Sequence, residues 1–314
     1  MEALAIAPAK IILFGEHFVV LGKPAIAMAI DLHAHVSVKE FNHGIHVESN
    51  KLNSFNQKDL EKSLKPIKLA AQSTLDHIGI SGVGLNIKVN SFIPIGVGLG
   101  SSAAVSVATI AAVTRFFGVN LDRREMCELA FIPEKEVHGK PSGIDQTTSI
   151  YGGIISFKPN KGFKRIPCKE LQLVVGNTKI IRSTKVLVSR VKELLDKKKD
   201  YAIELQKSYE FLYEEAVKAI RVKDFNKIGE LMIENHELLK KLGVSHEKLD
   251  KFVEKAVEAG AFGAKLTGAG GGGCMIALTD EEKRDRIAKA ISGIGGEVIM
   301  ANIDEEGVRT KVKF

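Results

Sequence analysis

The sequence contains no tryptophan, only four tyrosines and only three cysteines in 314 residues. A surface that stacks nucleic-acid bases needs more aromatic side chains than this, so we expect no nucleic-acid partner. The cysteines, Cys127, Cys168 and Cys274, are odd in number, far apart and form no CxxC pair. Their spacing argues against a disulfide framework or a structural zinc site, and we expect small buried hydrophobic residues.

Long apolar runs and an export signal are also lacking. No stretch reaches the roughly 18 consecutive apolar residues that a membrane-spanning helix requires. The opening "MEALAIAPAKIILFGEH" has an acid at position 2 and a lysine inside its apolar run, unlike a secretory signal. We therefore expect a cytoplasmic protein with no membrane partner.

The overall composition is that of an ordinary globular protein with a net positive charge. The chain has 45% hydrophobic and 26% charged residues. Its 314 residues exceed the size at which a single hydrophobic core stops growing, so two domains are expected. A net charge of +7 favours anionic partners such as nucleotides and acidic metabolites. Most lysines alternate with glutamates, as on solvated helix faces.

Hydrophobic periodicity predicts strands and helices mixed without a regular βαβ rhythm. Strands are predicted at 33–41, 84–92, 153–157 and 171–178, and helices at 67–78, 101–117 and across about 183–258. Asp122 and Glu125 have capping-box spacing and predict another helix start. The polar stretch 159–170 is predicted to be a connector that divides the chain into domains 1–160 and 161–314. Both halves are therefore expected to be α+β.

The stretch "GVGLGSSAAVSVA" at 96–108 places three glycines directly before a helix. Glycines there allow phosphate oxygens to approach the free N–H groups and positive dipole of a helix start. The alternative is a tight turn that Ser101 caps. A Walker loop is excluded, because neither Gly22-Lys23 nor Gly139-Lys140 is followed by Ser or Thr.

A second cluster, "KLTGAGGGGCMIAL" at 265–278, contains a literal GxGxxG. A strand-like run and no helix follows these glycines, which excludes a dinucleotide-binding fingerprint. Two interpretations remain: a backbone that approaches a ligand closely, and a mobile hairpin tip.

Acids surround a Gly-Lys-Pro-Ser-Gly turn in "EKEVHGKPSGID" at 134–145. Beside a triphosphate, one of two such carboxylates would hold Mg²⁺ and the other would face the attacking group, although an acid in a turn is often only a cap. Lys10, inside an apolar strand, either extends to the surface or pairs with an acid such as Asp145, which it would keep ionised. His17 is either a turn histidine or a substrate contact.

Four motifs in a set sequence order, and one short stretch between the last two, resemble those of a known protein family. They are "PAKIILFGEHFVVLGKPAIA", "PIGVGLGSSAA", "EKEVHGKPSGID" and "KLTGAGGGGC", with "NTKIIRST" between the last two. In order and spacing they resemble the GHMP kinase superfamily, and within it the mevalonate kinases. The resemblance implies two α+β domains, the second ferredoxin-like, with the active site in the cleft between them.

The resemblance also implies the reaction and the partners. The expected activity is transfer of the γ-phosphoryl of MgATP to the 5-hydroxyl of mevalonate, giving ADP and 5-phosphomevalonate for isoprenoid synthesis, by a protein that is expected to be a homodimer. Two alternatives stay open at this point. One is a sister kinase that acts on phosphomevalonate or another small hydroxy acid, and the other is a catalytically silent relative that only senses ligand.

Carried over by motif, Asp145 and Lys10 match the catalytic pair, and Ser102 and Glu134 match the Mg²⁺ ligands. The expected ATP-binding residues are Pro94, Ile95, Gly96, Val97, Gly98, Leu99, Gly100, Ser101 and Ser102. The expected substrate-binding residues are Glu16, His17, Arg182, Thr184, Gly268, Ala269, Gly270, Gly271 and Gly272. One position departs from the family pattern, because Ala9 stands where the family usually has glycine, so the strand path there is expected to differ slightly.

Overall fold

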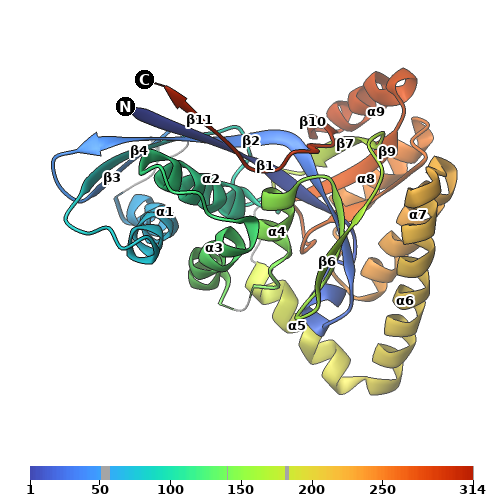
Figure 1. The fold of residues 1–314 in the computed structure, drawn as a ribbon. Helices are drawn as coiled ribbons and strands as arrows, with labels where there is room; N and C mark the ends of the chain where they lie inside the picture. The colour runs from blue at the N-terminus through green and yellow to red at the C-terminus, as the bar shows by residue number, and fades with distance from the viewer. Residues whose placement is uncertain (51–56, 140, 181–183, 314) are drawn as a thin grey trace.

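The fold consists of two β-sheets with their helices, seen side by side in Figure 1. The structure is a computed structural model that describes residues 1–50, 57–139, 141–180 and 184–313. The predicted α+β class is confirmed in both halves. Within the described ranges, no helix is long and apolar enough to cross a membrane.

The first sheet joins both ends of the chain. Its described strands are β1 (Glu2–Phe14), β2 (Ala25–Phe41), β3 (Ile45–Ser49), β4 (Gly84–Ser91), β5 (Ile154–Lys158), β6 (Gly162–Ile166) and β11 (Arg309–Lys313). The order is β11-β1-β2-β4-β3, and β5 pairs with both β2 and β6. Neighbouring strands are antiparallel except for β3 and β4. Because β11 pairs with β1, the two termini lie together in Figure 1.

Helices of the first half lie against one face of this sheet. They are α1 (Gln57–His77), α2 (Ser101–Phe116), α3 (Arg123–His138) and α4 (Ile144–Tyr151), and a short 3₁₀ turn, η1 (Phe18–Leu21), follows β1. Helix α2 is buried along its whole middle, from Ala103 to Thr114. A helix that is apolar on all sides belongs in a core, and its many alanines allow close packing on β1 and β2. This packing fixes the start of α2, where the first glycine cluster ends.

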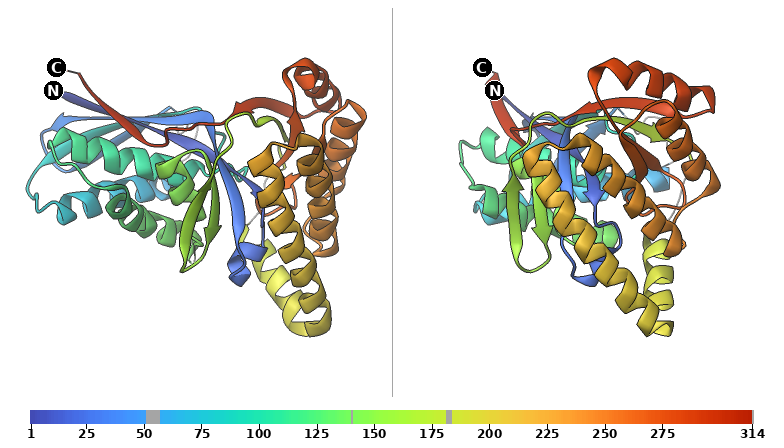
Figure 2. Two further views of the ribbon diagram at one scale, coloured as in Figure 1. Left: turned by 45° about the vertical axis from the view of Figure 1, so that its right-hand side comes forward. Right: turned by 90° about the vertical axis from the view of Figure 1, so that its right-hand side faces the viewer.

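The second sheet is antiparallel and has the ferredoxin-like order. Its described strands are β7 (Gln172–Asn177), β8 (Gly263–Thr267), β9 (Cys274–Thr279) and β10 (Glu297–Asn302), arranged β10-β7-β9-β8. The helices are α5 (Thr184–Lys197), α6 (Lys199–Val222), α7 (Phe225–Lys241) and α8 (Glu247–Glu258) before β8, and α9 (Glu281–Gly293) before β10. Numbered 1 to 4 along the chain, the strands lie side by side in the order 4-1-3-2, as in a βαββαβ unit. Helices α7 and α8 pack on β8, α6 packs on α7, and α5 contacts α6 and extends away from the sheet, as Figure 2 shows.

Local predictions from the sequence are largely confirmed. The Asp122 carboxylate accepts the backbone N–H of Glu125 at 2.8 Å, and the Glu125 carboxylate accepts the N–H of Asp122 at 2.8 Å, which completes the capping box. At Ala9 the strand continues, but the pairing of β1 with β2 shifts register between Pro8 and Ala9.

The predicted connector at 159–170 is wrong in one respect, because it contains strand β6. This strand is short, polar and mostly exposed, and it forms a hairpin with β5 at the edge of the first sheet. Strands there need few apolar residues, so the composition resembled a loop. The domain boundary at 160/161 stays a proposal, and the first sheet takes β6 and β11 from beyond it.

Candidate active site

Lys10 is the point at which β1, the first glycine cluster and α4 meet. Its side chain is only 5% exposed, and its Nζ lies 3.2 Å from Oδ1 of Asp145. The same Nζ donates to the carbonyl of Gly98 at 3.1 Å, and the backbone N–H of Lys10 donates to that of Leu99 at 3.0 Å. Of the two expectations for this lysine, the structure confirms internal pairing with Asp145.

Asp145 lies in the first turn of α4, where the helix dipole favours a negative charge. Its side chain is 27% exposed, so it remains partly accessible although it is paired with Lys10. One turn further along, the Ser149 hydroxyl donates to the carbonyl of Pro8 at 2.7 Å. Helix α4 is therefore attached to β1 at Pro8 and at Lys10.

The first glycine cluster has the backbone that only glycine adopts readily. Gly96, Gly98 and Gly100 have φ angles of 77°, 93° and 74°. At Gly100, directly before α2, an added Cβ would lie 2.9 Å from Cγ of Lys10. The loop can therefore pass directly against the lysine only because this residue has no side chain.

Replacing Gly100 by alanine is expected to displace Lys10 and lower kcat by at least about tenfold. Gly118→Ala, just beyond the other end of α2, is the matched control, because Gly118 has a similar φ of 71° and no atom of the described residues lies within 4 Å of an added Cβ. Both variants carry a similar backbone cost of about 1 kcal/mol. Steady-state kinetics at saturating ATP check this expectation. Equal kcat values for the two variants would show that contact with Lys10 does not matter.

The carboxylate of Glu134, near the end of α3, is buried and lies near a second negative charge, and both disfavour its ionised form. The residue is 2% exposed. Burial, and after it the negative charge of Asp145, raise its pKa to about 7, while the nearby Ser102 hydroxyl and the charge of Lys10 oppose the rise. Glu134, Asp145, Ser102 and Lys10 thus form one electrostatic cluster.

This cluster fits a magnesium ion. Two carboxylates and a hydroxyl supply hard oxygen donors, and a cation there would offset the repulsion between Glu134 and Asp145. In the part of the chain that the structure describes, no three His, Cys, Asp or Glu side chains gather into a metal site by themselves. Mg²⁺ does not require one, since it commonly takes one or two carboxylates and completes its shell with phosphate oxygens and water.

The raised pKa of Glu134 predicts a pH effect on the stability of metal-free, nucleotide-free protein. Because its folded pKa of about 7 exceeds the ordinary 4.5, the folded state favours the protonated form. This stabilisation is complete below pH 4.5 and is lost as the pH rises through 7, a change of up to about 3 kcal/mol. Glu134→Gln cannot titrate, so between pH 5 and 8 it should gain free energy of unfolding relative to the wild type. Urea unfolding at both pH values measures this gain, and a constant difference would contradict it.

The second half of the chain contacts the end of β1 through β8 and the loop between β8 and β9. His17 Nε2 donates to the carbonyl of Ala269 at 2.8 Å. Thr267 Oγ1 donates to the carbonyl of Ile12 at 2.9 Å and accepts the N–H of the same residue at 3.3 Å. These contacts place the second glycine cluster beside the end of β1. Sequence reasoning did not single out Thr267.

Backbone hydrogen bonds also hold the second glycine cluster, which disagrees with a mobile hairpin tip. Gly271 N–H donates to the carbonyl of Val244 at 2.7 Å, and Gly273 N–H donates to that of Ile180 at 3.2 Å. The Thr178 N–H donates to the carbonyl of Gly273 at 2.8 Å. The loop between β8 and β9 is therefore held in place by neighbouring segments and is not a mobile hairpin tip.

A cavity of about 330 Å³ lies between the two halves. Pro94, Ile95, Gly96 and Val97 line it from the first half, and Asn177, Lys179, Ile180 and Glu297 line it from the second. Four of the residues expected to bind ATP therefore face a common space with residues of the second sheet.

Glu16 is fully buried and is paired inside the protein. Its side chain and that of Lys265 in β8 are both 0% exposed and form an ion pair. Burial raises the pKa of Glu16 and lowers that of Lys265, and their mutual attraction opposes both shifts. The expected substrate contact of Glu16 stays a prediction, and the ion pair adds a structural role. Lys265 was missed, although a lysine inside the apolar "GAKLT" carries the same signal as Lys10.

Two further expected residues stay predictions. Thr184 is exposed at the first position of α5, and Arg182 lies outside the described residues.

Comparison with known proteins finds two matching family models and relatives that align with nearly the whole chain. Family models described as "GHMP kinases N terminal domain" and "GHMP kinases C terminal" match residues 65–153 and 216–295. A mevalonate kinase of Thermococcus gammatolerans is 41% identical, with 98% of each chain covered, and one of Methanocaldococcus jannaschii is 38% identical, covering 91% of this chain and 94% of the relative.

Solved structures give the same result. The crystal structure of Methanococcus jannaschii mevalonate kinase has a TM-score of 0.86 and 36% identity, covering 96% of this chain and 98% of that one. The L. major mevalonate kinase, solved with R-mevalonate, has a TM-score of 0.85 and 30% identity, covering 96% and 95%. With this identity over nearly the whole length and the ferredoxin-like second sheet, the chain belongs to the GHMP kinases and, within them, to the mevalonate kinase family.

Proposed function

We propose that this kinase transfers the γ-phosphoryl group of ATP to the 5-hydroxyl of mevalonate at the Lys10 and Asp145 pair. The observation that carries this assignment is the position of the pair. A buried lysine joins an accessible carboxylate, 3.2 Å away, to a glycine loop whose backbone it also contacts. Relatives that share the whole chain are named for the same activity.

In the proposed reaction Asp145 accepts a hydrogen bond from the 5-hydroxyl and directs its oxygen at the γ-phosphorus. The new P–O bond forms as the bond from the γ-phosphorus to the bridging oxygen breaks, and ADP leaves with that electron pair. The hydroxyl proton passes to Asp145 late, because phosphoryl transfer has a loose transition state in which positioning dominates. The Lys10 ammonium holds the carboxylate in place and offsets charge on the transferring group.

The phosphates are proposed to lie against residues 94–102. The glycines with positive φ have no side chains to keep phosphate oxygens from the backbone, and the start of α2 adds its free N–H groups and dipole. Ser102 and Glu134 would hold Mg²⁺, which offsets phosphate charge when it is bound. Mevalonate is proposed to lie among Glu16, His17, Arg182, Thr184 and the loop 268–272. The contact between His17 and Ala269 brings two of these segments together.

Measuring ADP release with a panel of acceptors tests the assignment. Mevalonate should give the highest kcat/KM, above phosphomevalonate, homoserine and galactose. Turnover with phosphomevalonate alone would assign a sister activity. Protein that binds MgATP but releases no ADP with any acceptor would be a ligand sensor.

The cellular setting and the assembly are also proposals. All three cysteines are free, as suits a reducing compartment, and we infer a cytoplasmic location.

We also infer a homodimer. Phe211 and Val222, about three turns apart on α6, are 66% and 74% exposed and would gain from being covered. Light scattering should give twice the chain mass, and Phe211→Glu should lower it.

A further inference from the structure

Helix α4 is short enough that its two ends move together. It has eight residues, and Asp145 is in its first turn. At 1.5 Å per residue, Tyr151 at its last position lies only about 9 Å along the axis from Asp145. The final carbonyls of a helix have no partner within it, so what binds them decides how firmly the end is held.

Residues 304–309, which connect β10 to β11 and include the first residue of β11, supply one of these partners; we call this segment the clasp. The N–H of Val308 donates to the carbonyl of Ile150 at 3.3 Å. The N–H of Gly153, just beyond the helix, donates to the carbonyl of Asp304 at 2.7 Å. The end of α4 is therefore bound by residues from the far end of the chain.

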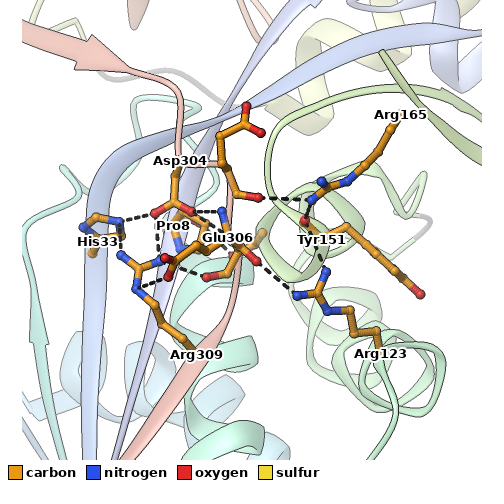
Figure 3. Close-up of polar contacts among 11 residues, drawn as sticks. Pro8, His33, Arg123, Tyr151, Arg165, Asp304, Glu306 and Arg309 are labelled. Carbon is orange, nitrogen blue, oxygen red and sulfur yellow. Dashed lines mark hydrogen bonds and ion pairs between the residues drawn. The ribbon is translucent and has the colours of Figure 1, made fainter. Parts of the chain in front are cut away.

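The Asp304 side chain gives the clasp its shape, as Figure 3 shows. Its Oδ1 accepts the N–H of Gly307 at 2.8 Å and that of Glu306 at 3.1 Å. Its Oδ2 accepts from His33 Nε2 at 2.6 Å and from Arg309 Nη1 at 2.9 Å. Asp304 is 6% exposed, so one buried carboxylate closes the turn and fastens it to β2.

Two arginines join the clasp to the helix end a second time. Arg165 donates to the carbonyl of Tyr151 and, at 3.1 Å, to that of Glu305. Arg123 donates to the carbonyl of Tyr151 at 3.4 Å and to that of Glu306 at 3.2 Å. In Figure 3 both guanidinium groups lie between the two segments.

The helix end and the clasp also touch without any side chain between them. Gly152 has a φ of 69°, and an added Cβ would lie 2.4 Å from the backbone nitrogen of Gly307. A displacement of the clasp therefore displaces the end of α4 directly.

We propose that the clasp sets the position of Asp145, and that Asp304 is accordingly a positioning residue for phosphoryl transfer. The inference rests on the proposed role of Asp145. Removing the Asp304 carboxylate loosens the turn at 304–307 and so releases the end of α4. The substrate sites keep their residues, but the carboxylate that directs the attacking oxygen shifts. The loss therefore falls on kcat and not on binding.

The test compares Asp304→Ala with Asp31→Ala in the full chain. Asp31 is the control, because its carboxylate also joins β2 to the returning chain but outside the clasp. It accepts the N–H and the side-chain amide of Asn302, at the end of β10, at 2.8 and 2.7 Å. Asp304→Ala should lower kcat by at least about tenfold, with the KM values for ATP and mevalonate within about twofold. Asp31→Ala should keep kcat within about twofold.

Hydrogen exchange of the amides 147–152 is the second measurement, and it needs no acceptor. It should be faster in Asp304→Ala than in Asp31→Ala. If Asp304→Ala does not fold, Asp304→Asn takes its place, since its amide oxygen can keep the turn bonds but its NH₂ group cannot accept from His33 and Arg309. Its kcat and exchange should change in the same direction by a smaller factor. Equal kcat in the two variants, a change confined to KM, or equal exchange would each overturn the inference. A wild type that is inactive with mevalonate, together with faster exchange, would overturn the proposed function and leave the clasp intact.

Discussion

Asp145→Asn is expected to lower kcat by about 10² or more while the dissociation constant for ATP changes by less than about twofold. The amide keeps the size of the carboxylate but cannot accept the hydroxyl proton, and it gives up the charge that pairs with Lys10 at 3.2 Å. Both losses act mainly in the transition state, since Asp145 is proposed to contact the attacking hydroxyl and not the nucleotide.

Steady-state kinetics and a nucleotide titration measured on the same preparation separate these quantities. Asp196→Asn, the same change at an exposed position on α5, controls for handling and should behave as the wild type. An intact kcat with lost ATP binding would place Asp145 in the nucleotide site and contradict the assigned role.

Lys265→Met should cost about 3–5 kcal/mol of unfolding free energy, because it leaves a buried Glu16 charge without its partner. Both side chains are fully buried, and the second carboxylate oxygen of Glu16 has no hydrogen-bond partner among the described residues. Adding Glu16→Leu to Lys265→Met should recover much of the loss, because an apolar pair of similar volume replaces the ion pair.

Urea unfolding of the two single variants and the double variant measures this coupling. Lys218→Met breaks an exposed ion pair with Glu215 and should have a far smaller effect. If the double variant loses as much as the two single variants combined, the two charges do not compensate one another in the folded protein.

Features set by neighbouring residues could be predicted from the sequence. The capping box at Asp122 depends on a spacing of three residues, and the first glycine cluster depends on the helix that follows it. Lys10 could be interpreted because a buried ammonium in an apolar strand needs an acid, and the Asp145 turn offered one.

The features that could not be predicted join distant parts of the chain. Lys265 and Glu16 are 249 residues apart, and His33 and Asp304 are 271 apart. No periodicity connects such pairs, because the fold of both sheets brings them together. Strand β6 was missed for a different reason, since an edge strand buries little apolar surface and its sequence resembles a loop.

A crystal structure with a non-hydrolysable ATP analogue and mevalonate tests the central claim most directly. We expect the triphosphate to lie against residues 96–102 and the 5-hydroxyl oxygen to lie about 3 Å from the Asp145 carboxylate, in line with the γ-phosphorus. A triphosphate bound away from the glycine loop, or a hydroxyl directed away from Asp145, would contradict the account.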